Sequence, residues 1–85
     1  MASYSLGINA SAAKELEAIP LRDRRRVARK IGGLAEEPRP AGCEKLSGQE
    51  RYRLRQGDYR ILYEVNDTAQ TVTVVKIGHR RDVYR

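Results

Sequence analysis

Apolar and polar residues alternate along the second half of the chain, as they do in half-buried strands. The alternating stretches are residues 50–56, 59–66 and 71–77. Gly57-Asp58 and residues 67–70 separate them and are rich in residues that favour turns. A shorter alternating stretch, residues 4–8, predicts one more strand at the start of the chain.

The spacing of apolar residues is helical between the first and second predicted strands. The apolar positions are Ala12, Leu16 and Ile19 before Pro20, then Val27, Ile31 and Leu34 within residues 21–35. A loop rich in proline and glycine follows over residues 36–42. The order β-α-α-β-β-β predicts one α+β domain over residues 1–85, a small four-stranded sheet with an N-terminal helical hairpin on one face.

Alternation also divides the side chains of each strand between two faces. The apolar face, which we expect to pack on the helices, carries Tyr52, Leu54, Tyr59, Ile61, Tyr63 and Val65. The opposite face carries Arg51, Arg53, Arg55, Arg60, Lys76 and, if the last strand continues, Arg80. Glu64 is the one acid expected there, so the face favours an anionic partner, although strand residues that face water are often charged.

Three apolar residues fall on this open face by the same alternation. They are Leu62, Val72 and Val74, and together they predict an apolar patch beside the cations that binds a protein partner. The alternative is a partly wet edge of the core. The same count places His79 on the core face with Val75 and Ile77.

Composition narrows the class of partner. The 85 residues include 17 Lys and Arg against 11 Asp and Glu, a net charge of +6, which favours nucleic acid or an acidic protein. One Cys and one His give no basis for a disulfide framework or a structural zinc site. We expect no cofactor and no membrane span, and the absence of a signal-peptide pattern makes the cytoplasm the expected compartment.

Two segments carry a resemblance to a known family. They are residues 45–64, with Tyr-Arg-Leu-Arg-Gln-Gly-Asp-Tyr-Arg-Ile-Leu-Tyr-Glu from 52 to 64, and the ending Gly-His-Arg-Arg-Asp-Val-Tyr-Arg from 78 to 85. With the N-terminal half they resemble the RelE/ParE toxin superfamily over essentially the whole chain. The resemblance implies a four-stranded, mostly antiparallel sheet flanked by helices. In the RelE branch it implies cleavage of mRNA in the ribosomal A site and neutralisation by a RelB-like antitoxin that binds the toxin, with Leu62, Val72 and Val74 as the expected contact.

The resemblance also implies a set of nuclease residues. The matching positions are Arg53 and Arg55 as the basic pair, Arg60 after a Tyr, Arg80 at the exit of the last strand, and Tyr84 near the C-terminus. We expect Arg55, Arg60, Arg80 and Tyr84 in catalysis, with His79 as a further acid–base candidate, and Arg51, Arg53 and Lys76 in RNA binding. The chemistry would be metal-independent attack by the RNA 2′-hydroxyl.

The basic pair departs from the family pattern, in which these positions are often Lys and one of them is argued to be the general base. Both are Arg here, and a guanidinium with a pKa above about 12 is a poor base at neutral pH. Two alternatives therefore stay open. One is a ParE-like inhibitor of DNA gyrase without nuclease activity, and the other is a catalytically weak protein that binds the antitoxin and regulates its operon.

Overall fold

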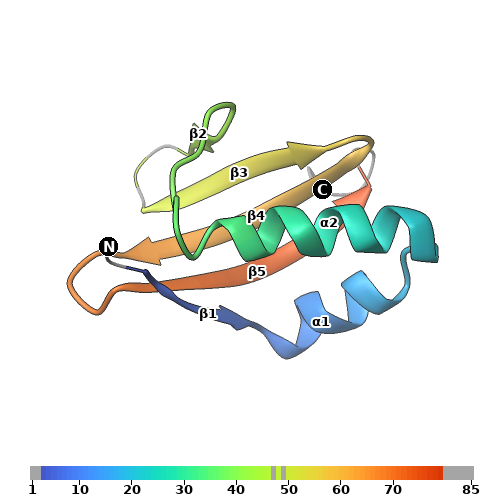
Figure 1. The fold of residues 1–85 in the computed structure, drawn as a ribbon, viewed down its shortest axis with the longest axis horizontal. Helices are drawn as coiled ribbons and strands as arrows, with labels where there is room; N and C mark the ends of the chain where they lie inside the picture. The colour runs from blue at the N-terminus through green and yellow to red at the C-terminus, as the bar shows by residue number, and fades with distance from the viewer. Residues whose placement is uncertain (1–2, 47, 49, 80–85) are drawn as a thin grey trace.

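The fold is a mixed sheet with both helices on one face, as described by a computed structural model over residues 3–46, 48 and 50–79 (Figure 1). Within those ranges the elements are β1 (Ser5–Ile8), α1 (Ala10–Glu17), α2 (Leu21–Gly33), β2 (Glu44–Lys45), β3 (Arg51–Gln56), β4 (Tyr59–Asn66) and β5 (Thr71–His79). The strand order is β1-β5-β4-β3-β2, with β1 parallel to β5 and every other pair antiparallel. The predicted α+β architecture is confirmed.

The sheet has one strand more than the sequence predicts. The extra strand, β2, has two residues that pair with Arg53 and Tyr52, and a strand this short leaves no alternating pattern to detect. The limits of β4 agree with the predicted ones, whereas β5 continues two residues further than expected, to His79. Neither helix in the described part of the chain is long and apolar enough to cross a membrane.

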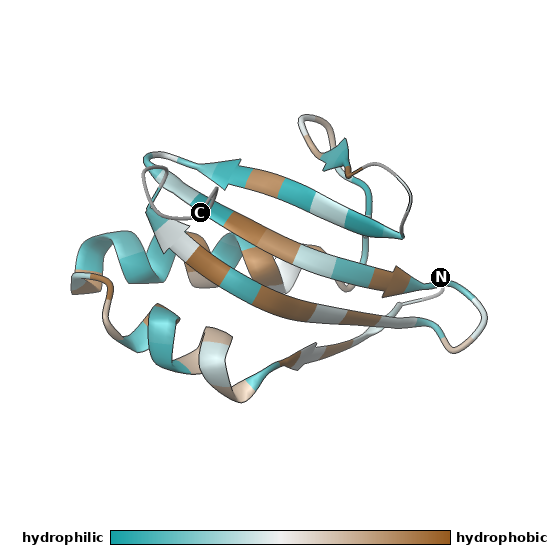
Figure 2. Cartoon of the chain, turned by 180° about the vertical axis from the view of Figure 1, so that it is seen from behind, coloured by the Kyte–Doolittle hydropathy of each residue, from teal (hydrophilic) through white to brown (hydrophobic). Residues whose placement is uncertain are grey.

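The core lies between the helices and one face of the sheet. The helices contribute Ala12, Ile19, Val27, Ile31 and Leu34, and the strands contribute Tyr52, Leu54, Ile61, Tyr63, Val65, Val72, Val74 and Ile77. Fully burying a side chain such as Val or Leu stabilises the fold by roughly 1.5–3 kcal/mol, so this cluster dominates its stability. Figure 2, which views the sheet from the side away from the helices, shows the hydrophobic residues concentrated in β4 and β5.

One irregularity in β5 overturns part of the predicted division into faces. Leu62 pairs with Lys76 and Tyr63 pairs with Val74, so Val75 has no partner on β4 and forms a β-bulge. The alternation reverses at this extra residue. Val72 and Val74 are therefore 0% exposed in the core, and their predicted place on the open face is wrong.

Arg39 connects the loop after α2 to β3 and to the β4–β5 turn. Its Nη2 lies 2.8 Å from Oδ2 of Asp67 in the β4–β5 turn, and its Nε donates to the Tyr52 hydroxyl at 2.8 Å. The Tyr4 hydroxyl donates to Asp67 at 2.7 Å. The hydrogen bond from Arg39, followed by that from Tyr4, keeps the pKa of the Asp67 carboxyl below its usual value.

The bulge predicts different costs for two neighbouring valines. Val74→Ala leaves a cavity in the core, so we expect it to lower the free energy of unfolding by about 2–3 kcal/mol. Val75→Ala removes a half-buried side chain from the bulge and is expected to cost less than about 1 kcal/mol. Urea denaturation of both variants measures the difference. Equal costs, or a larger cost at Val75, would contradict the register.

The Arg39–Asp67 ion pair predicts a pH dependence of stability. A carboxyl whose pKa is lower in the folded than in the unfolded state stabilises the fold above the unfolded value, about 3.9, and stops doing so as the pH falls through the folded value. We therefore expect Asp67→Asn to be less stable than the wild type at pH 7 and the gap to close below about pH 4. Urea titrations at each pH test this, with the exposed Glu36→Gln as control. A gap that stays constant down to about pH 2 would contradict it.

Candidate nucleic-acid interface

The face of the sheet away from the helices carries a row of arginines. Alternate positions of β3 place Arg51, Arg53 and Arg55 on this face, and the register sets Arg55 directly opposite Arg60 of β4. Like charges directly opposite each other destabilise a strand pair. The sheet keeps this arrangement, which brings two guanidinium groups to one end of the open face.

The arginines nearer the other end are neutralised. Arg51 Nη2 lies 2.6 Å from Oε2 of Glu64, and Arg53 Nη2 lies 3.0 Å from Oε1 of Glu44. The expectation of a single acid on this face is wrong, because β2 brings a second one. Ion pairs on a protein surface contribute only about 0–1 kcal/mol, so a phosphate can replace either carboxylate at little cost.

Arg55 and Arg60 differ in exposure although they face each other. Arg55 is exposed, whereas Arg60 is 8% exposed and is the one buried charged side chain among the described residues. Gly78 lies opposite Arg60 on β5, so the residue directly across from Arg60 has no side chain. A buried cation held in one position is suited to a developing negative charge, because it needs little reorganisation. Arg55, on the facing strand, is accessible to a ligand from solvent.

Lys76 shares the open face with its cross-strand neighbour Leu62 but directs its ammonium elsewhere. Its Nζ lies 3.2 Å from Oε2 of Glu15 in α1. The other oxygen of Glu15 accepts a hydrogen bond from the Ile77 amide at 2.9 Å, at the part of β5 that extends beyond β1. Lys76 is thus drawn towards the edge of the sheet and away from Arg55.

His79 lies on the core side of the sheet, as the alternation predicts. It pairs with Tyr59 across β4 and β5, and the two rings meet edge to face with centroids 5.7 Å apart. Its neighbour Gly78 is the residue that faces Arg60. His79 and the arginines are therefore on opposite faces of the sheet.

The structure places only one of the three residues of the predicted apolar patch on the open face. Leu62 lies half-buried on the open face between Arg53 and Lys76, whereas Val72 and Val74 belong to the core. Arg80 and Tyr84, both predicted to act in catalysis, lie outside the described residues.

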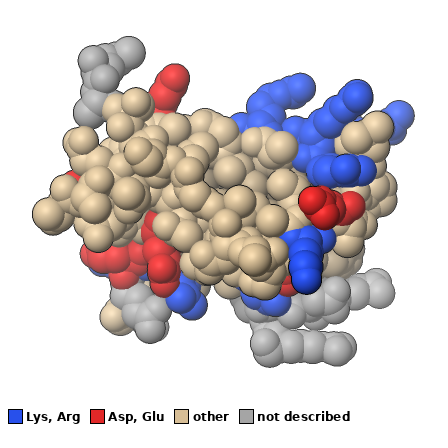
Figure 3. Space-filling view, turned by 90° about the horizontal axis from the view of Figure 1, so that it is seen from below, with Lys and Arg blue, Asp and Glu red and all other residues tan. Residues whose placement is uncertain are grey.

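Three further cations, which the strand pattern does not predict as part of the site, lie beside the edge of β3. Arg26, Arg29 and Lys30 of α2 line a hollow of about 490 Å³ against Leu54 and Gln56 of β3. Figure 3 shows many of the Lys and Arg side chains in view gathered at one side of the molecule. The charge run in α2 is visible in the sequence, but only the fold shows that it lies beside β3.

Three comparisons place the chain among known proteins. Residues 7–84 match the family of ParE toxins of type II toxin-antitoxin systems. The chain is 31% identical to Toxin RelG of Mycobacterium tuberculosis over 96% of its own length and 97% of that protein.

Solved structures of RelE proteins share the fold. The RelE–RelB complex of Pyrococcus horikoshii matches with a TM-score of 0.81 and 28% identity, over 95% of this chain and 99% of that one. The RelBE2 complex of Mycobacterium tuberculosis gives 0.80 and 27%, over 92% and 99%. The isolated RelE toxin of Escherichia coli gives 0.80 and 29%, over 96% and 92%.

The different burial of the two facing arginines predicts different effects on stability. Arg55→Gln changes an exposed side chain, and we expect the free energy of unfolding to stay within about 0.5 kcal/mol. Arg60→Gln removes a buried cation together with its contacts, and we expect a loss of about 1–3 kcal/mol. Urea denaturation measures both, and equal effects would contradict the placement of Arg60.

Proposed function

The chain belongs to the RelE/ParE toxin family of type II toxin-antitoxin systems, and from this membership we propose that it cleaves messenger RNA in the A site of the ribosome. One observation carries the proposal: Arg53, Arg55 and Arg60 lie together on the face of the sheet that the helices leave open. Arginine forks match phosphate geometry, and three of them on one surface suit the backbone of a nucleic acid.

The proposed reaction is an internal phosphoryl transfer. The RNA 2′-oxygen attacks the adjacent phosphorus while the bond from phosphorus to the 5′-oxygen breaks, giving a 2′,3′-cyclic phosphate and a 5′-hydroxyl. The 2′-hydroxyl loses a proton and the leaving 5′-oxygen gains one, so the charge to stabilise is that of the phosphorane. Arg60, held in place by burial, would bind its oxygens, and Arg55 would close on them from the facing strand.

None of the described cations at this site is a good general base. A guanidinium is a poor proton acceptor at neutral pH, so neither Arg53 nor Arg55 is suited to take the proton of the 2′-hydroxyl. His79 lies on the other face of the sheet beside Tyr59. We infer that catalysis depends on charge stabilisation by the arginines and on in-line positioning of the message by the ribosome. Arg80 and Tyr84 keep their proposed roles in binding the phosphorane and orienting a base.

A RelB-like antitoxin is the proposed protein partner, and the cytoplasm, with its translating ribosomes, is the proposed place of action. RelE relatives from Mycobacterium tuberculosis and Pyrococcus horikoshii crystallised in complex with their antitoxins. Leu62, half-buried between Arg53 and Lys76, is the apolar residue of the open face that such a partner would cover. An antitoxin bound there would block the site.

The match to the ParE family over residues 7–84 supports a second candidate function, a ParE-like inhibitor of DNA gyrase. It shares the fold and the positive charge but needs no nuclease site. A catalytically weak protein that binds the antitoxin and regulates its operon is a third, supported by the paired Arg53 and Arg55. Whether the messenger RNA is cleaved distinguishes these two candidates from the ribonuclease.

Mapping of 5′ ends on a translated reporter message after brief induction tests the proposal. We expect new ends inside codons, only when the message is translated, and at least about tenfold fewer in Arg55→Gln, in line with the loss of one charged group that acts in the transition state. Arg22→Gln, an exposed substitution on α2, is the control and should cleave like the wild type.

Two results would contradict the ribonuclease. Growth arrest with intact message would favour the inhibitor of gyrase. Intact message with normal growth, together with tight antitoxin binding, would leave the regulatory protein. Equal cleavage by Arg55→Gln and the wild type would refute the site but not the activity.

A further inference from the structure

The outer edge of β3 is free along half of its length. β2 pairs with β3 at Tyr52 and Arg53 only, so the edge of Leu54–Gln56 has no neighbouring strand among the described residues. Two hollows open at this edge. One lies towards α2, and the other continues towards the side chains of the open face.

The two hollows share part of their lining and are basic. The first, of about 490 Å³, is lined by Arg26, Arg29, Lys30, Gly33, Pro40, Leu54 and Gln56. The second, of about 330 Å³, is lined by Lys30, Ala41, Gly42, Glu44, Arg53, Leu54 and Arg55. Lys30 and Leu54 line both, so the two hollows are neighbours along the edge, and together we call them the edge groove. Its one acid, Glu44, is already paired with Arg53.

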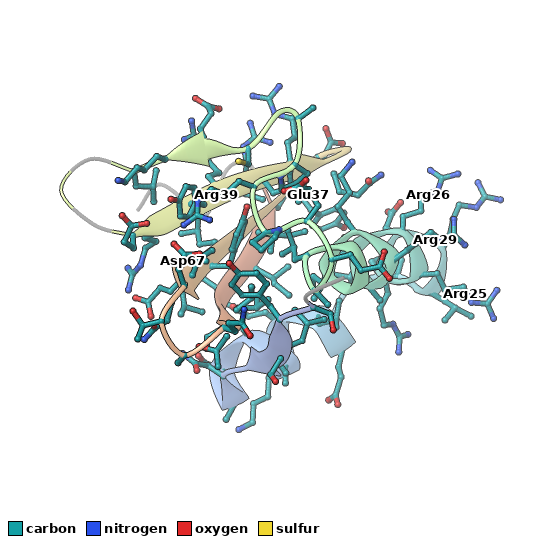
Figure 4. All side chains as sticks on the ribbon, turned by 60° about the vertical axis from the view of Figure 1, so that its left-hand side comes forward. Arg25, Arg26, Arg29, Glu37, Arg39 and Asp67 are labelled. Carbon is teal, nitrogen blue, oxygen red and sulfur yellow. The ribbon has the colours of Figure 1, made fainter. Side chains whose placement is uncertain are left out.

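The α2 cations of the groove lie close enough along the helix to repel one another. Arg26 lies three residues before Arg29 and four before Lys30, and like charges at these spacings each cost a helix roughly 0.2–0.5 kcal/mol. None of the three forms an ion pair with a described residue. Figure 4 shows Arg26 and Arg29 projecting from α2 into solvent. An anion bound among them would relieve this repulsion.

The lining fits a phosphate backbone better than an acidic peptide or a row of bases. Among the described residues no aromatic side chain lines either hollow, so this lining offers bases no ring to stack on. Leu54, the largest apolar residue of the lining, is 2% exposed, which leaves the small Pro40 and Ala41 as the apolar surface for a peptide side chain. What remains is a line of guanidinium and ammonium groups, which recognise phosphates without regard to sequence.

We propose that the RNA strand flanking the cut passes over the free edge of β3 and lays its phosphates in the edge groove, against Arg26, Arg29 and Lys30. This inference rests on the proposed ribonuclease function, because it extends the same strand from the open face. Arg53 and Arg55 line both the open face and the groove, so they connect the two. Lys30, shared by both hollows, is the middle contact.

Binding of a labelled 2′-O-methyl RNA dodecamer, which cannot be cleaved, tests the groove at several salt concentrations. The test variant Arg26→Gln/Arg29→Gln/Lys30→Gln removes three positive charges from it. The matched control Lys14→Gln/Arg22→Gln/Arg25→Gln also removes three exposed charges, one from α1 and two from α2, none of which lines the groove. Both variants carry the same net charge, so any difference reflects position.

Loss of three phosphate contacts should lower the slope of log affinity against log salt by about 2, since each contact on a single strand contributes about 0.7. Between about 50 and about 200 mM salt the affinity of the wild type should then fall about 20-fold more than that of the test variant. The control variant should keep most of the wild-type slope. Equal losses in the two variants would overturn the groove and leave diffuse attraction.

Two neighbouring glycines give a second test. A Cβ added at Gly32 or Gly33 meets no atom within 4 Å, so both positions of α2 accept a side chain, but only Gly33 lines the groove. Gly33→Glu should weaken RNA binding several-fold more than Gly32→Glu. Equal effects would overturn the proposal.

Cleavage of a translated message, measured on the same variants, separates this inference from the proposed function. A wild type that binds the RNA through the groove but cuts no message refutes the ribonuclease and supports the groove as a nucleic-acid site. A wild type that cuts message while both triple variants bind RNA equally refutes the groove alone. Loss of antitoxin binding with unchanged RNA binding in the test variant also refutes it, and assigns the groove to the antitoxin.

Discussion

The extra residue in β5, opposite the step from Leu62 to Tyr63, decides which face of the sheet is apolar. It lets Val74 and, beyond the bulge, Ile77 both point to the helices, while Lys76 stays on the open face. Without it one end of β5 would turn its apolar side chains out beside the arginines. The separation of an apolar face from a cationic one depends on this bulge.

Because the apolar and the cationic side chains lie on opposite faces, the positive charge of the site is concentrated on one surface. Burial of the apolar face leaves the arginines of β3 and β4 on a surface to which, among the described residues, β2 and β4 supply the acids Glu44 and Glu64. These carboxylates pair with Arg53 and Arg51, whereas Arg55 forms no ion pair with a described residue. The same end of β3 lacks a neighbouring strand, and this opens a route from the site to the cations of α2.

Most of the fold could be predicted from the sequence because alternation and helical spacing are strong in β3, β4 and α2. The bulge could not be predicted, because strict alternation through Val75 assigns Val72 and Val74 to the wrong face. β2 has only two residues, too few to show an alternating pattern of apolar and polar positions. The arginines of the open face were placed correctly, but their partners depend on register, and the approach of Lys30 to Arg53 depends on how α2 crosses the sheet.

The central claim is that the open face of β3 and β4 binds RNA, and the side-chain Nε–H signals of the arginines test it most directly. NMR spectra of ¹⁵N-labelled protein, recorded with and without an uncleavable RNA oligonucleotide, report on each guanidinium. The account predicts that the signals of Arg53, Arg55 and Arg60 move on binding and that Arg39, held by Asp67 and Tyr52, stays unchanged. Unchanged signals for all three open-face arginines in saturating RNA would contradict it.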